Sequence, residues 1–412
     1  MTATNTRATL LVCAAAALFE GFDNQSMGVA APLVFREFLI PPSQGGVIFS
    51  AATLGLFLGA AVGGRMADYI GRRRMLMVSL LLFGIGSLFT AAARSADMIL
   101  LTRLLTGLGC GGAMPNFISM TAEAVDPRRR LSAVTVVMAA LPLGGALAGV
   151  AALADRLGWG WRSIFVIGGV APILAALLIP LVFRGPETAA RRAATASTSI
   201  GSRAIEGVGA ILWGMRRART TALLWTGFFF TQLVLFLMLN WLPSLIVGLG
   251  YSRAQASLAS IAFNIAGSVG AASLGRFHAG ERRRQWVVST YTGIALALMG
   301  LVAMSAIGQS FATVILSSSV AGFFIIGAQL VLFALAPLYY PSAGRGTGVG
   351  AAVAVGRLGS VAGPLFAATL LASGRASGTV LAGIVPFVLI AGSAALALTW
   401  QPLEQPECPP QI

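Results

Sequence analysis

The chain has 412 residues, of which 57% are hydrophobic and only 10% are charged, and its mean hydropathy is +0.85. A soluble fold of this length cannot bury so much apolar surface, so the composition excludes a soluble protein and indicates a polytopic membrane protein. The formal net charge is +15 and all 28 basic side chains are arginine. Such a charge also suits nucleic-acid binding, so the positions of the arginines decide its meaning.

Apolar windows of about 20 residues, the length that crosses a bilayer as an α-helix, recur along the whole chain. We expect twelve spans, at 9–31, 46–67, 75–93, 98–119, 132–153, 163–183, 220–247, 254–275, 286–305, 310–333, 347–371 and 378–399. The first is expected to be retained, because the segment before it is too short and too weakly charged for a cleaved signal peptide. The sequence therefore predicts an all-α integral membrane protein with twelve transmembrane helices.

The arginines are distributed unevenly about these spans. With the N-terminus in the cytoplasm, twenty of the 28 lie in cytoplasmic segments, six lie outside, and two lie within spans. This bias follows the positive-inside rule, so the basic charge reports topology. We expect both termini in the cytoplasm, a lipid bilayer as the surroundings, and no nucleic-acid partner.

One long polar segment divides the spans into six and six. It predicts an N-terminal bundle over 1–183, a cytoplasmic linker over 184–219 and a C-terminal bundle over 220–412. A shift of 211 residues places Pro32 on Pro243 and the pair Gly64-Arg65 on Gly275-Arg276. Parallel repeats of this kind flank a binding site at the bilayer midplane and rock about it for alternating access.

A loop of distinctive pattern joins the second and third spans. It reads Gly-x-x-x-Asp-x-x-Gly-Arg-Arg, with Gly64, Asp68, Gly71, Arg72 and Arg73 at its defined positions. A tight glycine turn that holds one acid among fixed cations at a membrane face suits a latch that breaks and reforms. We expect these residues to take part in gating.

The loops after the fourth and tenth spans are a second related pair. They carry Glu123 and Arg130 in the first half and Arg345 in the second. With Asp68, these charges are expected to close the inner face in the outward-open state. The alternative is solvated charge that only sets the orientation.

The first span carries acids close to mid-depth. Glu20, Asp23, Asn24 and Met27 are spaced i, i+3, i+4, i+7 and share one helical face. Burial and mutual repulsion both favour the protonated form of neighbouring carboxyl groups, so we expect Glu20 and Asp23 to couple transport to protons. The alternative is a structural ion pair with an arginine of another span.

Arg357 lies ten residues into the eleventh span, roughly 15 Å deep at 1.5 Å per residue. A planar guanidinium suits bidentate capture of a carboxylate. A substrate anion, or Glu20 or Asp23, is the expected partner.

Arg103 begins an Arg-x-x-x-Gly-x-Gly run in the fourth span, with Gly107 and Gly109. The run suits an arginine that crosses a groove cleared by glycines, in a gate or a proton relay. Ordinary close packing of membrane helices is the alternative.

Further polar side chains are candidates for the cavity wall: Asn24, Asn116, Gln232, Asn240, Asn264 and Gln329. Of these we assign Asn24, Asn116, Asn240 and Gln329 to substrate binding, although amide hydrogen bonds between helices are also ordinary structural contacts. Trp241 is expected to stack on a ligand ring, with interfacial anchoring as the alternative.

Catalytic and metal-binding chemistry has no basis in the residues. The three cysteines, Cys13, Cys110 and Cys408, have no paired or ligand spacing, and His278 stands alone. We expect no cofactor, no metal site and no enzymatic activity.

The loop at Gly64, the Arg103 run and the twelve-span layout together resemble the major facilitator superfamily. Tyr69 departs from the pattern, since the family usually has a basic residue there. More narrowly, Glu20-Gly-Phe-Asp23 is similar to the Asp-Gly-Phe-Asp element of the aromatic acid:proton symporters, and the segment around Arg357 is similar as well.

What this resemblance implies is symport of an aromatic carboxylic acid, such as 3-(3-hydroxyphenyl)propionate, with a proton across a bacterial cytoplasmic membrane. Glu20 and Asp23 are then expected to carry the proton and Arg357 to face the carboxylate, in a functional monomer. Symport of a sugar acid or dicarboxylate, or proton-driven efflux, is the alternative. Efflux antiporters usually carry Gly-Pro in the fifth span, where this chain has Pro142 before its glycines.

Overall fold

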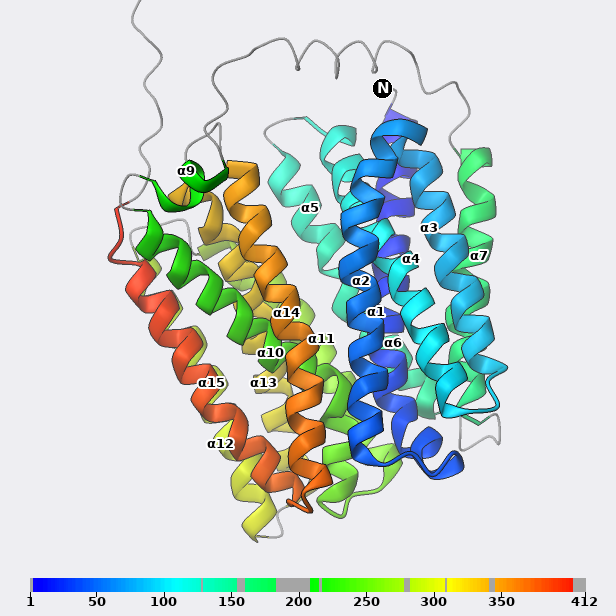
Figure 1. Ribbon diagram of the computed structural model, residues 1–412, viewed down its shortest axis with the longest axis vertical. Coiled ribbons are helices and arrows are strands. Elements are labelled where there is room, and N and C mark those ends of the chain that lie inside the picture. Colours follow the sequence, from blue (N-terminus) through cyan, green and yellow to red (C-terminus); the bar gives the residue numbers. More distant parts are fainter. Residues whose placement is uncertain are drawn as a thin grey trace, which may run out of the picture.

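The computed structural model describes residues 3–126, 129–153, 160–182, 208–214, 217–277, 282–307, 310–340 and 345–402 (Figure 1). The secondary-structure elements of the described chain are all helices. The helices of the first half are α1 (Ala3–Glu37), α2 (Pro42–Ile70), α3 (Arg72–Ala91), α4 (Ala96–Ala124), α5 (Arg130–Met138), α6 (Ala140–Leu153) and α7 (Arg162–Val182). Those of the second half are α9 (Val208–Trp213), α10 (Ala218–Gly248), α11 (Arg253–Phe277), α12 (Arg283–Ile307), α13 (Phe311–Leu335), the 3₁₀ turn η3 (Ala336–Tyr339), α14 (Arg345–Ala372) and α15 (Ser377–Leu398).

Eleven segments of the described chain are long and apolar enough to cross a membrane, with α5 and α6 together forming one of them. The remaining predicted span is α1, which is 35 residues long but contains Glu20 and Asp23 in its middle. The predicted all-α membrane fold is confirmed. Most of the predicted linker lies outside the described residues, and its last part contains α9 and the start of α10.

The turn between the second and third spans is shorter than expected. Helix α2 continues through Gly64 to Ile70 and α3 begins at Arg72, so a single residue separates them. That residue, Gly71, has φ +91°, which a side chain at Cβ disfavours. The prediction that Gly64 lies in the turn is wrong, because α2 satisfies its own backbone hydrogen bonds up to the Gly71 N–H, which donates to the Ala67 carbonyl.

The fifth span is broken between α5 and α6. Pro142 is in the first turn of α6 and has no N–H to donate to the carbonyl of Met138, four residues earlier. The helix is interrupted at Ala139 for this reason.

Helices in each half pack through glycines against neighbouring backbone. A Cβ at Gly107 of α4 would lie 2.0 Å from the Ala52 oxygen of α2, and one at Gly322 of α13 would lie 1.9 Å from the Phe263 oxygen of α11. The second and fourth spans of each half are therefore in the same close contact. The first and fifth spans of each half also pack closely, as α1 with α6 and α10 with α14.

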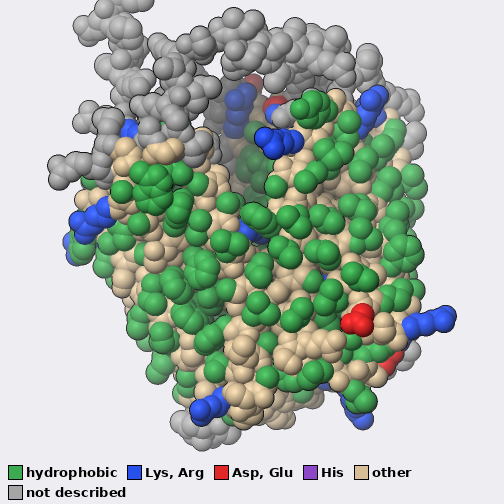
Figure 2. All heavy atoms as spheres, in the orientation of Figure 1, with side chains coloured by type: hydrophobic (Ala, Val, Ile, Leu, Met, Phe, Trp, Pro, Cys, Tyr) green, Lys and Arg blue, Asp and Glu red, His purple; other side chains and the backbone are tan. Residues whose placement is uncertain are grey.

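The helices form two side-by-side groups, α1–α7 and α10–α15, that diverge toward the end where the N-terminus lies (Figure 1). We call this the upper end. The surface is hollowed there between the groups, with charged side chains of both signs in the hollow (Figure 2). The molecule is therefore open toward its upper end.

The lower end is closed between the halves. The Trp241 indole of α10 donates to the Pro364 oxygen of α14 at 3.0 Å, and its ring contacts Phe35 and Phe49 from the first half. In addition, the hydroxyl group of Ser50 donates to the Val361 oxygen at 2.9 Å. Aromatic packing and the hydrogen bond from the Ser50 side chain to the Val361 main chain close this side between the halves.

A charged cluster joins the lower ends of α1 and α7. The Glu37 carboxylate accepts hydrogen bonds from Arg162 at 2.7 Å and from the Trp161 indole at 2.5 Å. The Arg162 guanidinium also lies over the Trp161 ring, 4.4 Å from its centroid. The hydrogen bonds from Arg162 and Trp161 hold the pKa of Glu37 below its ordinary value.

Candidate functional site

A cavity of about 700 Å³, part of it open to solvent, lies between the two halves. Its wall comes from α1, α4, α5 and α6 on one side and from α10, α11, α13 and α14 on the other. Most of the wall is apolar, from Leu, Met, Phe, Ile and Pro side chains, and the polar lining residues are Glu20, Asn24, Asn264, Gln329 and Arg357. An apolar cavity with a few polar groups is the usual form of a small-molecule site.

Glu20 and Arg357 enter this cavity from opposite halves, on α1 and α14. Glu20 is only 2% exposed, and its Oε2 has no hydrogen-bond partner in the described chain. The Arg357 guanidinium has the Met114 sulfur at 3.3 Å, across the junction of the halves. No carboxylate of the described residues lies within 4.0 Å of Arg357, so neither predicted internal pair is formed and both charges face the cavity.

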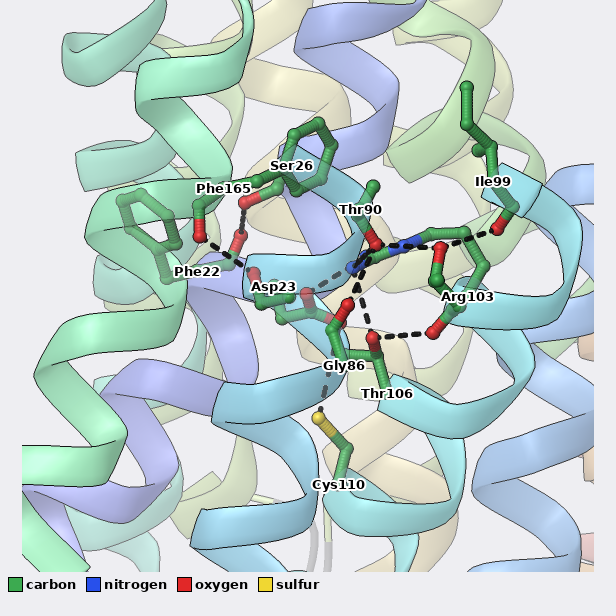
Figure 3. A network of polar contacts seen from close by, with 12 residues as sticks. Phe22, Asp23, Ser26, Gly86, Thr90, Ile99, Arg103, Thr106, Cys110 and Phe165 are labelled. Atoms are coloured by element: carbon green, nitrogen blue, oxygen red, sulfur yellow. Dashed lines mark hydrogen bonds and ion pairs between the residues drawn. The ribbon is translucent and has the colours of Figure 1, made fainter. Parts of the chain in front are cut away.

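Asp23, one helical turn below Glu20, forms a buried ion pair (Figure 3). Its Oδ1 lies 2.9 Å from Nη1 of Arg103, and the two side chains are 5% and 1% exposed. Nη2 of Arg103 donates to the hydroxyl oxygens of Thr90 and Thr106, both at 3.1 Å. The predicted alternative for the acids, an ion pair with an arginine of another span, is thus present for Asp23 and absent for Glu20.

Two further groups surround this ion pair. The Cys110 thiol, on the same helix as Arg103, lies 3.9 Å from Oδ2 of Asp23, whereas Arg103 bonds Oδ1 (Figure 3). The Arg103 guanidinium also lies over the Phe165 ring, 4.9 Å from its centroid. Four helices, α1, α3, α4 and α7, therefore hold the pair in place.

A smaller cavity of about 340 Å³ lies beside the ion pair, between α1, α2, α4 and α10. Asp23, Arg103 and Asn240 line it, and Phe49 of the lower closure also faces it. Asn24 and Phe236 line both cavities. The smaller cavity therefore lies next to the larger one, on the side of the closed lower end.

The residues assigned to substrate binding divide between these places. Asn24 and Gln329 line the large cavity and Asn240 lines the small one. Asn116 donates to the Gly112 oxygen of its own helix, and Trp241 is buried in the lower closure; neither lines a described cavity. Their substrate contacts remain predictions.

The residues assigned to gating lie mainly near the upper end. Arg72 forms an ion pair with Glu123, and Arg73 donates to the Ile179 oxygen at 3.3 Å. Arg130 is exposed at the start of α5. These described contacts stay within the first half, so their gating role remains a prediction.

Two gating residues, Asp68 and Arg345, have side chains outside the described part of the structure. Gly109, like Gly107, contacts a neighbouring helix, since a Cβ there would lie 2.4 Å from the Phe83 nitrogen. Close packing, the alternative that the sequence left open for these glycines, is therefore what the structure has at both positions.

Sequence reasoning missed several partners of the charged residues. Thr106 stands three residues after Arg103, and this spacing is a usable signal. Thr90, Cys110 and Met114 carry no such signal, because their roles depend on how separate helices rotate against each other. In the described chain, no three His, Cys, Asp or Glu side chains are grouped to hold a metal ion.

Two helical groups around a cavity at mid-depth, open at one end and closed at the other, define a membrane transport protein. A family model, the Major Facilitator Superfamily, matches residues 13–364, and the chain belongs to this superfamily. It is a transporter and not an enzyme, in keeping with its relatives.

Curated relatives match nearly the whole chain. The 3-(3-hydroxy-phenyl)propionate transporter of Escherichia coli (strain K12) is 40% identical over 95% of this chain and 93% of that protein. The gallate transporter of Pseudomonas putida is 32% identical over 89% of this chain and 85% of that protein. The 4-hydroxybenzoate transporter PcaK of the same organism is 31% identical, with coverages of 89% and 86%.

Among solved structures, the D-xylose-proton symporter has a TM-score of 0.75 and 20% identity, and covers 96% of this chain and 97% of its own. A bacterial Spinster homologue in an inward-facing, unoccupied conformation has a TM-score of 0.74 and 16% identity, over 97% and 98% of the two chains. These likenesses establish the fold.

Proposed function

We propose that this transporter takes up an aromatic carboxylic acid, such as 3-(3-hydroxyphenyl)propionate, together with a proton. The relatives with high identity are named for aromatic acids. The observation that carries the proposal is the placement of one arginine and one unpaired acid, Arg357 and Glu20, in the wall of a single apolar cavity.

The substrate site is expected at Arg357. Its guanidinium is buried, at 7% exposure, and has only a thioether as a side-chain partner in the described chain. A thioether is a weak acceptor, whereas a carboxylate accepts two parallel hydrogen bonds from a guanidinium. An incoming carboxylate therefore displaces Met114, while the aromatic ring contacts Leu235, Phe236 and Leu239.

Proton coupling follows from competition for this one cation. A substrate carboxylate and an ionised Glu20 in the same poorly solvated cavity repel each other, and one guanidinium neutralises only one of them. Binding of the anion therefore favours a protonated Glu20, and protonation of Glu20 favours binding of the anion. Substrate and proton then enter and leave together.

Asp23 is proposed as a second coupling residue. Its ion pair with Arg103 lies between the large cavity and the lower closure, next to the smaller cavity. Protonation of Asp23 would release Arg103 from its carboxylate partner and weaken the hold of α4 on α1. Protonation of Asp23 would in this way alter the contact between α1 and α4.

We place the N-terminus in the cytoplasm of a bacterial cell, because the arginine distribution supports that orientation. The upper opening then faces the cytoplasm. The bundles over 1–183 and 220–412, joined by the linker over 184–219, would rock about the cavity within a functional monomer. In the outward-open state the upper end would be closed by Gly64, Asp68, Gly71, Arg72, Arg73 and Arg345.

The test is uptake into proteoliposomes of radiolabelled 3-(3-hydroxyphenyl)propionate, with and without an inward proton gradient. Benzoate, gluconate and an aliphatic acid serve as competitors. Accumulation that needs the gradient and is blocked by aromatic acids alone supports the proposal. Absence of uptake, or competition by gluconate, refutes the aromatic-acid assignment and favours another organic anion or efflux.

Glu20→Gln separates the two parts of the proposal. The amide mimics a permanently protonated acid, so the variant should exchange substrate across the membrane but should no longer accumulate it with the gradient. Accumulation at the wild-type level would contradict a proton-carrying role for Glu20. Asp68→Asn should instead slow transport without altering the order of competitors, and a changed order would argue against gating.

A further inference from the structure

The large cavity contains a polar group that the proposed function has not used, the side-chain amide of Asn264 on α11. We infer that its carbonyl oxygen selects substrates whose ring bears a hydrogen-bond donor, so that the preferred class is hydroxylated aromatic acids. This inference rests on the proposed function, since it concerns the same cavity and the same substrate.

The orientation of this amide follows from a chain of hydrogen bonds that ends on main-chain carbonyls. Gln25 of α1 donates from Nε2 to the Leu239 oxygen at 2.8 Å. Because a main-chain carbonyl only accepts, Gln25 must present its nitrogen there and its oxygen to the other side. That oxygen accepts from Nδ2 of Asn264 at 3.2 Å.

The second hydrogen of the Asn264 nitrogen is also used. Nδ2 donates to the Ser260 oxygen, one turn earlier in α11, at 2.9 Å. A flipped amide would place its oxygen against two acceptors, which is unfavourable. Both donors of Asn264 are thus committed, and within the described chain its Oδ1 accepts no hydrogen bond.

Asn264 lines the large cavity beside Leu141 and Pro142 of α6. A Cβ at Gly145 of α6 would lie only 2.4 Å from Oδ1 of Asn264 and would cover it. The absence of a side chain at Gly145 therefore leaves room for this oxygen beside α6. Asn264 itself is 2% exposed, so the acceptor has little competition from solvent.

Because Oδ1 of Asn264 can only accept a hydrogen bond, it distinguishes ring substituents that donate from those that only accept. A phenolic hydroxyl donates to it. A methoxy group or a second carboxylate also only accepts, and therefore leaves two lone pairs facing each other in a buried place. Within the described residues, no side-chain hydrogen bond fixes the amides of Asn24 and Gln329, the other amides of the wall, so each can present either end.

A hydrogen bond from the substrate hydroxyl to Asn264 would also be connected to the contact between the two halves. The hydrogen-bonded chain runs from Asn264 in the second half to Gln25 in the first and back to Leu239 in the second. A donor on the substrate strengthens such a chain, because hydrogen bonds in series polarise one another. Ring recognition and the contact between the halves are therefore linked.

The test compares three acids that differ at one ring position: 3-(3-hydroxyphenyl)propionate, 3-phenylpropionate and 3-(3-methoxyphenyl)propionate. Each is measured as a competitor and as a labelled substrate in proteoliposomes that contain the wild-type protein. The hydroxylated acid should bind roughly fivefold to tenfold more tightly than the unsubstituted one, and the methoxy acid should be the weakest. Equal affinities would overturn the inference.

Two variants then assign the selectivity to Asn264. Asn264→Leu keeps the size and should bring the three affinities close together. In Gln25→Met the amide of Asn264 keeps only its bond to the Ser260 carbonyl, so its orientation is less strongly fixed and the methoxy acid should gain relative to the hydroxylated one. A purely structural role for either residue would lower all three affinities equally, which would contradict the inference.

Ser260→Ala is the matched control on the same helix. Its hydroxyl donates only to the Ala256 oxygen of α11, while its main-chain oxygen, the partner of Asn264, is unchanged. This variant should keep the wild-type order. Absence of accumulation of any acid would refute the proposed function and the inference with it, whereas uptake of all three without preference refutes the inference alone.

Discussion

The ion pair between Asp23 and Arg103 predicts strong coupling between two substitutions. We expect Asp23→Leu and Arg103→Met each to destabilise the protein strongly, while the double variant that carries both is close to wild type in stability. The reason is that each single change leaves one buried charge without its partner.

The size of the effect follows from the contacts. Arg103 is 1% exposed and donates to Asp23 at 2.9 Å and to Thr90 and Thr106 at 3.1 Å. Removal of one partner from a buried pair of this kind costs about 3–5 kcal/mol, whereas replacement of both by apolar groups of similar volume is often neutral. The coupling free energy of the cycle should therefore be at least about 3 kcal/mol.

The assay is unfolding in detergent, by heat or by denaturant, for the wild type, the two single variants and the double variant. Uptake by the same four proteins is measured in proteoliposomes. The double variant should be folded and inactive, because it has lost the acid and the cation that we propose to use. Additive destabilisation, or a double variant as unstable as the singles, would refute the reasoning from a buried pair.

Other predictions concern single sites. Arg357→Lys should fail nearly as badly as Arg357→Ala in uptake, because an ammonium group cannot make two parallel bonds to a carboxylate; full rescue by lysine would contradict bidentate capture. Met114→Leu removes the thioether that occupies Arg357 and should lower the KM for uptake by a few-fold, whereas a large rise in KM would show that the sulfur helps binding. Gly71→Ala should destabilise by about 1 kcal/mol or more in thermal unfolding because of the positive φ, while Gly64→Ala, where a Cβ would meet no atom within 4 Å, should be neutral or slightly stabilising. The pKa of Glu37 is lowered in the fold, so its stabilising effect exists above its ordinary value near 4.5 and is lost as the pH falls through the lower folded value; Glu37→Gln should therefore reduce the unfolding temperature slightly at neutral pH, and the difference from wild type should shrink as the pH falls below 4.5.

Much of the fold was predictable because a bilayer imposes a length and an apolar composition on every span. The limits of the helices were less predictable. Helix α1 runs to Glu37, beyond the expected end at 31, because a helix can continue past the membrane when its end is held by Arg162 and Trp161. The interruption of the fifth span at Ala139 was not predicted, although Pro142 had been noted in the sequence.

The charged residues of the site could be predicted from the sequence, but the ion pairs between them could not. Glu20, Asp23, Arg103 and Arg357 stand out because charges in spans are costly. Which acid meets which arginine depends on the rotation and depth of separate helices, and no spacing within one helix contains that information. Asn264 was one amide among several until its hydrogen-bond partners distinguished it.

The break in the fifth span has a mechanical consequence. Below it, α6 is locked to α1, since a Cβ at Gly144 would lie 1.9 Å from the Leu18 oxygen. Above it, α5 is a separate nine-residue helix whose last residue, Met138, lines the cavity. Because Pro142 donates no backbone hydrogen bond to Met138, bending at Ala139 would move Met138 in the cavity wall and leave the contact between α6 and α1 in place.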